Sequence, residues 1–214
     1  CGDADRVLER TEGKQVQGVL LTHTHSDHIY GIEELMRHFP HLKIYTNAYG
    51  IEALRSPKLN ISRYHSEYPD ITLEASDSVR AVAEGDIIEI LGEPMRVFET
   101  PGHDPSCLTF QVEDKLFTGD AYIPGERVFT GFPHSNKQQA QQSVERIVGL
   151  SEGCLIMPGH TLESGQKEIY LSNREKIVDG STAMTLKALK AFTDAHGLSA
   201  VVLDGFEHGW HECH

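Results

Sequence analysis

Apolar residues along the chain form two kinds of run, short continuous stretches and longer segments with helical spacing. The continuous stretch 16–21 is bounded by Gly13 and by a polar cluster that starts at Thr22, which predicts a buried strand. Apolar residues then recur at helical spacing from Ile29 to Phe39 and stop before Pro40. This predicts a helix that buries one face and ends there. The alternation of strand and helix indicates an α/β layer arrangement.

The other expected elements follow from the same two patterns. We expect strands at 43–46, 79–82, 87–91, 95–100, 107–112, 116–118, 154–157 and 198–203. We expect helices at about 4–11, 48–55, 138–150, 165–178 and 182–196. Turn signals such as Glu-Gly-Asp separate the strands between 79 and 118, which predicts one antiparallel meander. The polar stretch 58–78 has no clear periodicity and is interpreted as a surface excursion.

Composition narrows the classes of function. With 214 residues, 39% of them hydrophobic and 24% charged, the chain suits one globular domain. No apolar run approaches the roughly 18 to 20 residues that span a bilayer. A formal charge of −13 disfavours nucleic acid as a partner. A small-molecule substrate is therefore expected, with no nucleic acid and no membrane.

Cysteine usage bears on the compartment. The 4 Cys are widely scattered without a Cys-x-x-Cys pair, which favours reduced, mostly buried thiols and a cytoplasmic location. The chain begins at Cys1 without Met, which leaves open that a segment precedes it. The count that stands out is 13 His, because imidazole is the commonest protein ligand of zinc and iron.

Four potential metal ligands lie within six residues, directly after the first strand. They are His23, His25, Asp27 and His28. In an extended turn the first two point to the same side, and the last two, at the start of a helix, can reach a second position a few ångströms away. Two cations could therefore share the cluster. The alternative is a polar loop in which Ser26 or Asp27 only caps the helix.

Three further candidates follow other predicted strands, each beside a glycine. They are His103, Asp120 and His160. Glycine lets the backbone turn sharply and approach a metal without a Cβ clash. Taken alone, a His after a turn is more often a solvated surface residue. Three such positions in one chain that also has the cluster at 23–28 are hard to assign to chance, so they are candidate ligands of the same cluster.

These motifs resemble those of the metallo-β-lactamase superfamily of binuclear metal hydrolases. The His-x-His-x-Asp-His motif is complete at 23–28, and the resemblance covers about residues 1–177, leaving 178–214 as an extension of unknown role. It implies an α/β fold, a four-layer αββα sandwich that here lacks the first strands. It also implies that one metal is held by His23, His25 and His103, that the other is held by Asp27, His28 and His160, and that Asp120 bridges them.

The chemistry implied is hydrolysis by a hydroxide that two divalent ions share, with Asp27 orienting the water or accepting its proton. Substrates compatible with this site are small esters, thioesters, lactones and related molecules. Zinc suits the His-rich set best, and iron and manganese also accept it. His25, where flavodiiron proteins use Glu, disfavours that branch. Asp120 resembles the glyoxalase II and lactonase pattern, which makes antibiotic hydrolysis the lesser option.

Departures from the glyoxalase II pattern keep other functions open. The residues after Asp120 lack that family's Gly-Arg-Phe pattern, so a glutathione thioester is not assigned. A mononuclear iron enzyme similar to persulfide dioxygenases would leave Asp27, His28 and His160 idle. A non-catalytic metal-binding protein is the third class.

Tyr64 and His65 in the excursion and His134 in the loop after Asp120 are candidate substrate contacts.

The tail 208–214 is rich in His and is interpreted as an accessory site, a lid or a solvated terminus. Without the first strands, one sheet edge is exposed. An incomplete chain, a carboxy-terminal strand at 200–203 or a second subunit in a homo-oligomer would each account for it.

Overall fold

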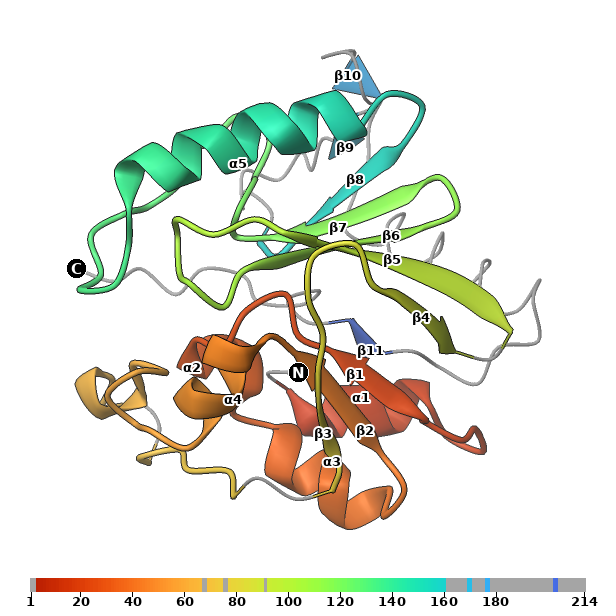
Figure 1. Ribbon diagram of the computed structural model, residues 1–214. Helices are drawn as coiled ribbons and strands as arrows, with labels where there is room; N and C mark the ends of the chain where they lie inside the picture. Colours follow the sequence, from red (N-terminus) through yellow and green to blue (C-terminus); the bar gives the residue numbers. More distant parts are fainter. Residues whose placement is uncertain are drawn as a thin grey trace.

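Two β-sheets face each other with helices on their outer sides, in a computed structural model of the chain (Figure 1). The structure describes residues 3–66, 69–74, 77–90 and 92–160, together with the backbone of 169–170, 176–177 and 202–203. This confirms the predicted α/β class and the αββα layering. Within the described residues, no helix is long and apolar enough to cross a membrane. The cytoplasmic location stays a prediction.

The first sheet is parallel and consists of the strands β11-β1-β2-β3 in that order. Their bounds are β1 Gly18–Leu20, β2 Lys43–Thr46, β3 Val79–Ala81 and β11 Val202–Leu203. The chain between them forms α1 Ala4–Arg10, α2 Ser26–Ile29, α3 Ile32–His38, α4 Ala48–Leu54 and the 3₁₀ turn η1 Ser62–Tyr64. Figure 1 shows α1 and α3 beneath this sheet. The predicted helix at 29–39 is confirmed from Ile32 to His38, whereas Ile29 is the last residue of α2 and is separated from α3 by Tyr30 and Gly31.

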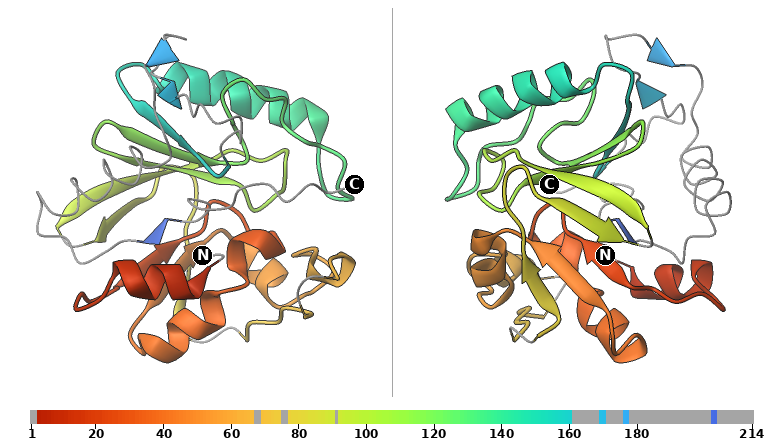
Figure 2. Two further views of the ribbon diagram at one scale, coloured as in Figure 1. Left: turned by 180° about the vertical axis from the view of Figure 1, so that it is seen from behind. Right: turned by 45° about the vertical axis from the view of Figure 1, so that its right-hand side comes forward.

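The second sheet has the order β4-β5-β6-β7-β8, antiparallel except for its last pair. Its strands are β4 Ile87–Ile90, β5 Glu93–Glu99, β6 Leu108–Val112, β7 Lys115–Gly119 and β8 Leu155–Pro158. Helix α5, Lys137–Leu150, makes the crossover from β7 to β8 and covers the outer face of this sheet in both views of Figure 2.

The sequence of strand β1 is continuously apolar because the strand is buried on both faces. Leu20 joins the core between the sheets, where it meets side chains such as Phe110 and Met157. Val19 and Leu21 point the other way, into the layer formed with the helices. Since successive side chains of a strand face opposite sides, a strand buried on both faces needs apolar residues at every position. Cys107 and Cys154 are buried free thiols, as predicted, and pack under α5.

The predicted meander is wrong at its first strand. β3 pairs in parallel with β2, through Ile44 opposite Val79, and belongs to the first sheet. The Glu-Gly-Asp turn that follows carries the chain across to the second sheet, where the Gly85 N–H donates to the Val97 carbonyl. A turn signal marks a reversal of the chain, but which strand lies beside which is decided by tertiary packing.

The carboxy-terminal predictions are tested at only a few residues. Ile169–Tyr170 (β9) and Lys176–Ile177 (β10) pair antiparallel, so the predicted helix at 165–178 is wrong there. Its Glu, Gln and Lys residues favour helix by propensity, which strand pairing overrides. The rest of that helix, the helix at 182–196 and the tail 208–214 lie outside the described residues. Strand β11 confirms the end of the strand expected at 198–203 and lies against the edge of β1.

Candidate metal centre

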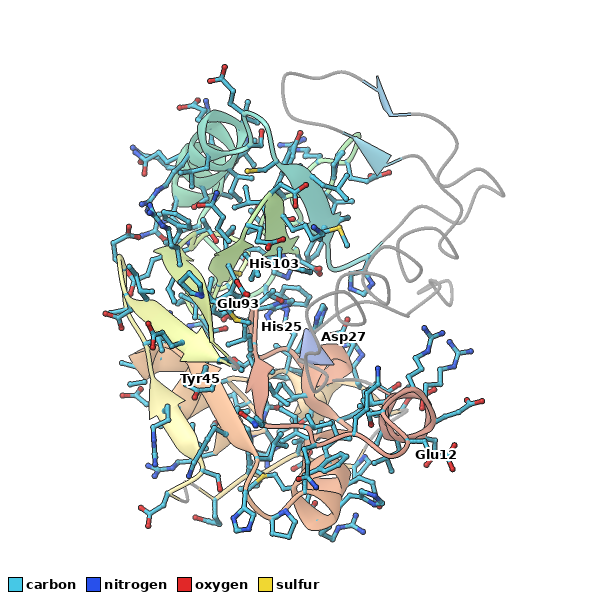
Figure 3. All side chains as sticks on the ribbon, turned by 90° about the vertical axis from the view of Figure 1, so that its right-hand side faces the viewer. Glu12, His25, Asp27, Tyr45, Glu93 and His103 are labelled. Atoms are coloured by element: carbon cyan, nitrogen blue, oxygen red, sulfur yellow. The ribbon has the colours of Figure 1, made fainter. Side chains whose placement is uncertain are left out.

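The seven predicted ligands converge at one edge of the sandwich, where strands of both sheets end. His23 and His25 lie in the loop between β1 and α2, and Asp27 and His28 lie in α2 itself. His103 follows β5, Asp120 follows β7 and His160 follows β8. In Figure 3, His25, Asp27 and His103 are seen close together at this edge. Residues separated by more than 130 positions in the sequence are thereby brought within contact of one another.

The capping alternative does not describe this loop. The residue that precedes the first turn of α2 is His25, and no side chain caps the helix. The carboxylate of Asp27 is directed instead to His28 and His160, each with its Nε2 atom 3.4 Å from Asp27 Oδ2. The Asp27 side chain therefore contacts the ligand cluster and does not cap the helix.

The first ligand group is made of imidazoles only. His23, His25 and His103 are all buried, and their facing ring nitrogens lie within 4.8 Å of one another. Nδ1 of His25 is 3.1 Å from Nε2 of His103. Neither ring nitrogen of His23 has a hydrogen-bond partner. Buried polar atoms are nearly always paired, so converging nitrogens of this kind fit a metal ion.

The second ligand group includes a carboxylate. It consists of Asp27, His28 and His160, and the Nε2 atoms of the two histidines are 3.1 Å apart. The Asp27 side chain is 37% exposed, whereas that of His28 is buried. This group therefore has one member that reaches toward solvent.

Asp120 lies between the two groups. Its Oδ2 atom is 4.0 Å from Nε2 of His23 and 3.8 Å from Nε2 of His103, in the first group. The same oxygen is 3.7 Å from Nε2 of His28 and 3.3 Å from Nε2 of His160, in the second. One carboxylate oxygen therefore lies between the imidazoles of both groups. Gly159 makes room for it, because a Cβ there would collide with Asp120 Oδ1.

Charge and burial suit these residues to ligation. Burial, and then His28, hold the pKa of His23 well below its ordinary value, and burial with His25 lowers the pKa of His103. Neutral imidazole is the form that binds metals. Burial alone would raise the pKa of Asp120, but His28 and His160 outweigh it, so the pKa is well below its usual range. For His160, burial lowers the pKa but Asp120 and Asp27 raise it, to about 9. Two carboxylates thus favour a cation at this position.

Asp104 is a member of the site that sequence reasoning missed. It is 2% exposed, and its Oδ2 atom lies 3.3 Å from Nε2 of His25, on the side of the ring away from His103. Burial would raise the pKa of Asp104, but His25 and Ser106 lower it below the ordinary value. In the sequence, the feature that could have indicated this role is the position of Asp104 directly after His103. Only the fold shows that the carboxylate contacts His25 instead.

The three predicted substrate contacts lie outside the ligand groups. His134 lies in the loop that follows β7, with its ring 6.2 Å from that of Tyr49. Phe132 of the same loop, which the sequence did not single out, packs against His25 at 4.6 Å between ring centroids. Tyr64 is 60% exposed at the end of η1, and His65 follows it. Neither of these two residues belongs to the ligand groups.

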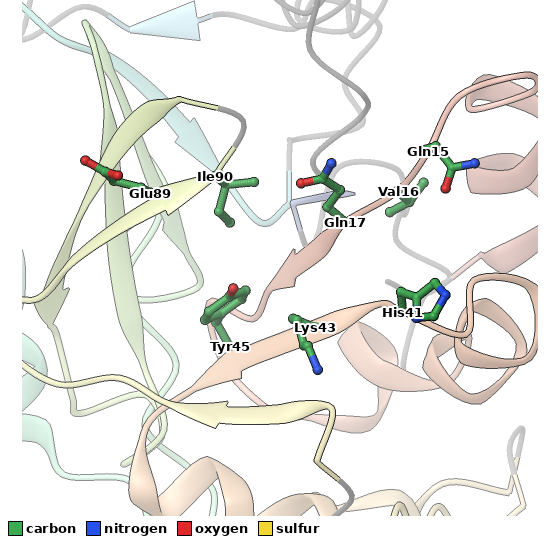
Figure 4. A pocket seen from close by; sticks show the side chains of 8 residues that line it. All are labelled: Gln15, Val16, Gln17, His41, Lys43, Tyr45, Glu89 and Ile90. Atoms are coloured by element: carbon green, nitrogen blue, oxygen red, sulfur yellow. The ribbon is translucent and has the colours of Figure 1, made fainter.

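A separate cavity of about 330 Å³ lies at the opposite ends of β1 and β2 (Figure 4). Gln17, Lys43 and Tyr45 line it from the first sheet, and Glu89 and Ile90 line it from β4. No ligand candidate lines this cavity, so it does not belong to the metal centre.

The fold and the ligand set define a metal-binding αββα protein, and comparison with known families gives its superfamily. Residues 1–160 match the family model described as the metallo-beta-lactamase superfamily, and the chain belongs to that superfamily. This confirms the resemblance drawn from the motifs. The match leaves 161–214 unassigned, and the predicted domain boundary at 177 stays untested.

The chain is also similar to individual proteins, at sequence identities of 24–29%. A hydroxyacylglutathione hydrolase of Citrobacter koseri is 29% identical over 175 residues, 80% of this chain and 59% of that protein. The chain spans between half and three fifths of the length of the first curated relatives it matches. Among solved structures, the B3 metallo-beta-lactamase BLEG-1 is 25% identical with a TM-score of 0.68, over 75% of this chain and 78% of that chain. TTHA1623 in a di-iron-bound form is 24% identical with a TM-score of 0.62, over 75% and 79%.

Proposed function

We propose that this protein hydrolyses a small thioester or ester by means of two divalent metal ions. The observation that carries the proposal is the position of Asp120, whose Oδ2 lies within 4.0 Å of imidazole nitrogens from both ligand groups. Similarity to hydroxyacylglutathione hydrolases favours thioesters over lactones and other esters.

We assign the ligands to two metal ions, one for each ligand group. His23, His25 and His103 would hold one ion, Asp27, His28 and His160 the other, and Asp120 both. Zinc is the ion we expect first, because it suits His with carboxylate, although iron and manganese accept the same donors. When bound, such a pair of ions lowers the pKa of a shared water and polarises the substrate carbonyl.

The chain's own residues would position the reactants. The carboxylate of Asp27 is the partly exposed member of the second group and contacts His28 and His160. In the proposed reaction it would orient an incoming water and accept its proton. Phe132 covers His25 and His103 with an apolar ring, which excludes solvent from that side of the first group.

The test combines metal content with a matched substrate series. Protein purified without a metal-affinity step is analysed for metals and assayed with an S-hydroxyacylglutathione, with the same acyl group on a short thiol, and with a β-lactam. We expect two equivalents of metal per chain and hydrolysis of thioesters that is lost on chelation and restored by zinc.

Two results would overturn the proposal. One equivalent of iron, with oxygen uptake on a persulfide, would indicate the mononuclear oxygenase. Two tightly bound ions with no turnover on any thioester, ester, lactone or β-lactam would indicate a non-catalytic metal-binding protein. Comparison of the two thioesters shows whether the glutathione portion is recognised. If it is, the thioester of the short thiol will be the poorer substrate.

A further inference from the structure

We propose that Asp104 is a positioning residue for the first ligand group: it holds the His25 ring so that Nε2 carries the proton and Nδ1 is the metal donor. The inference rests on the proposed metal centre and extends it to a residue outside the seven ligands.

The geometry of the ring gives the first argument. Nε2 of His25 is buried and makes no aligned hydrogen bond, and the carboxylate oxygen beside it is Asp104 Oδ2 at 3.3 Å, while Nδ1 faces Nε2 of His103 at 3.1 Å. An ionised carboxylate only accepts hydrogen bonds, so the His25 nitrogen that faces it is the one that carries hydrogen. In a neutral imidazole the lone pair is then on Nδ1, the atom that points into the ligand group.

The anchoring of Asp104 gives the second argument. Its Oδ1 atom accepts a hydrogen bond from the Ser106 N–H at 2.8 Å and another from the Ser106 hydroxyl. The Ser106 hydroxyl in turn accepts from the N–H and the hydroxyl of Thr24, each at 3.0 Å. Thr24 lies between His23 and His25 in the chain, so one network holds both the ligand loop and the carboxylate that faces it.

A third element fixes the same turn. Nδ2 of Asn47 donates to the Pro105 carbonyl at 3.0 Å, and Oδ1 of Asn47 caps α4 by accepting from the Gly50 N–H at 2.8 Å. The turn 104–106 is thus bound to the ends of both β1 and β2. A carboxylate held this rigidly can set the orientation of the ring it faces.

The charge distribution explains why such a residue is useful here. The second ligand group contains the carboxylate of Asp27, whereas the first consists of three imidazoles. Through His25, Asp104 supplies the first group with a negative charge that does not occupy a coordination position. Outer carboxylates of this kind increase the basicity of the ligating imidazole and the affinity for the metal.

The test compares Asp104→Asn with Asp114→Asn, which changes an exposed carboxylate in the turn between β6 and β7. Asparagine keeps the size of the side chain and an oxygen for Ser106, but it removes the charge. Zinc dissociation constants are measured for the folded proteins by competition with a chelator. We expect one of the two zinc ions of Asp104→Asn to bind about 10- to 100-fold more weakly and the other to change little. Asp114→Asn should match the wild type.

A second readout starts from the wild type, so that its first part does not depend on the variant's folding. In ¹⁵N spectra of the zinc-loaded wild type, we expect the His25 ring to show a coordinated Nδ1 and a protonated Nε2. In Asp104→Asn, the Nε2 proton should exchange faster with water. A purely structural role for Asp104 would lower stability but leave the zinc affinities of the folded protein unchanged.

The outcomes separate this inference from the proposed function. Coordination of His25 through Nε2, or equal affinities of wild type and Asp104→Asn for both ions, would overturn the role of Asp104 and leave the two-metal centre standing. A wild type that binds zinc at neither group would overturn the metal centre, and the role of Asp104 with it.

Discussion

The two ligand groups differ in how they meet solvent. His23, His25 and His103 are buried imidazoles, backed by Asp104 on one side and by Phe132 on another. The group of Asp27, His28 and His160 includes a carboxylate that is 37% exposed. A buried, fully braced site suits tight binding of a metal, whereas a partly open site suits exchange of water and substrate. We therefore expect the first group to hold its ion more tightly and the second to lie nearer the chemistry.

The largest effect should come from the residue that the two groups share. Because Asp120 lies within 4.0 Å of ligand nitrogens in both groups, Asp120→Ala is expected to lose metal from both and to reduce turnover to background. Elemental analysis and the thioester assay check this, with Asp114→Ala as the control at an exposed turn. An Asp120→Ala protein that keeps two equivalents of metal would show that the carboxylate does not bridge.

Removing the charge of Asp27 should separate binding from catalysis. We expect Asp27→Asn to keep at least the metal of the first group while turnover falls by roughly 10²- to 10⁴-fold, the usual contribution of a general base. Metal content and kcat are measured on the same preparation. If kcat is unchanged, the role in proton transfer belongs to another group.

A glycine at the edge of the site should link stability to metal affinity. In Gly159→Ala the new Cβ collides with Asp120 and approaches the backbone of Gly119. We expect a loss of about 1–3 kcal/mol in the free energy of unfolding, as for other overpacked sites, and weaker metal binding. The matched control is Gly149→Ala in α5, where a Cβ meets nothing within 4 Å. This control should gain about 0.5–1 kcal/mol. Equal effects of the two changes in urea unfolding would contradict the close approach at Gly159.

The smallest effect is expected at an ion pair that is not part of either group. Glu84 Oε1 lies 2.5 Å from Arg146 Nη2, and the Arg146 hydrogen bond lowers the pKa of Glu84. The stabilisation is therefore present above the ordinary pKa of Glu84 and lost as pH falls through the lowered value. For an exposed pair, Glu84→Gln should cost about 0–1 kcal/mol near neutral pH and leave metal content unchanged. The difference in unfolding free energy between wild type and variant should shrink in acid, and a difference that grows instead would contradict the pairing.

Most of the second sheet could be predicted because its signals are local. Alternating residues and turn signals define β4 to β7, which pair with their neighbours in sequence. The assignment of β3 failed because its partner, β2, lies more than 30 residues earlier and pairs in parallel. The failure at β9 and β10 has a different cause, because these two strands pair with each other locally and a helix-forming composition conceals them.

The amino-acid sequence by itself determined the α/β class, the superfamily and a set of seven residues, since ligand type, spacing and position after a strand are local properties. The family resemblance also implied how those residues group, and the tertiary structure brings the members of each group together from segments far apart in the chain. Only the tertiary structure decided that Asp104 turns toward His25 rather than toward its neighbour His103. The Thr24 and Ser106 hydrogen bonds that brace this turn join residues 82 positions apart. Contacts at such separations depend on how the two sheets pack, which no local pattern encodes.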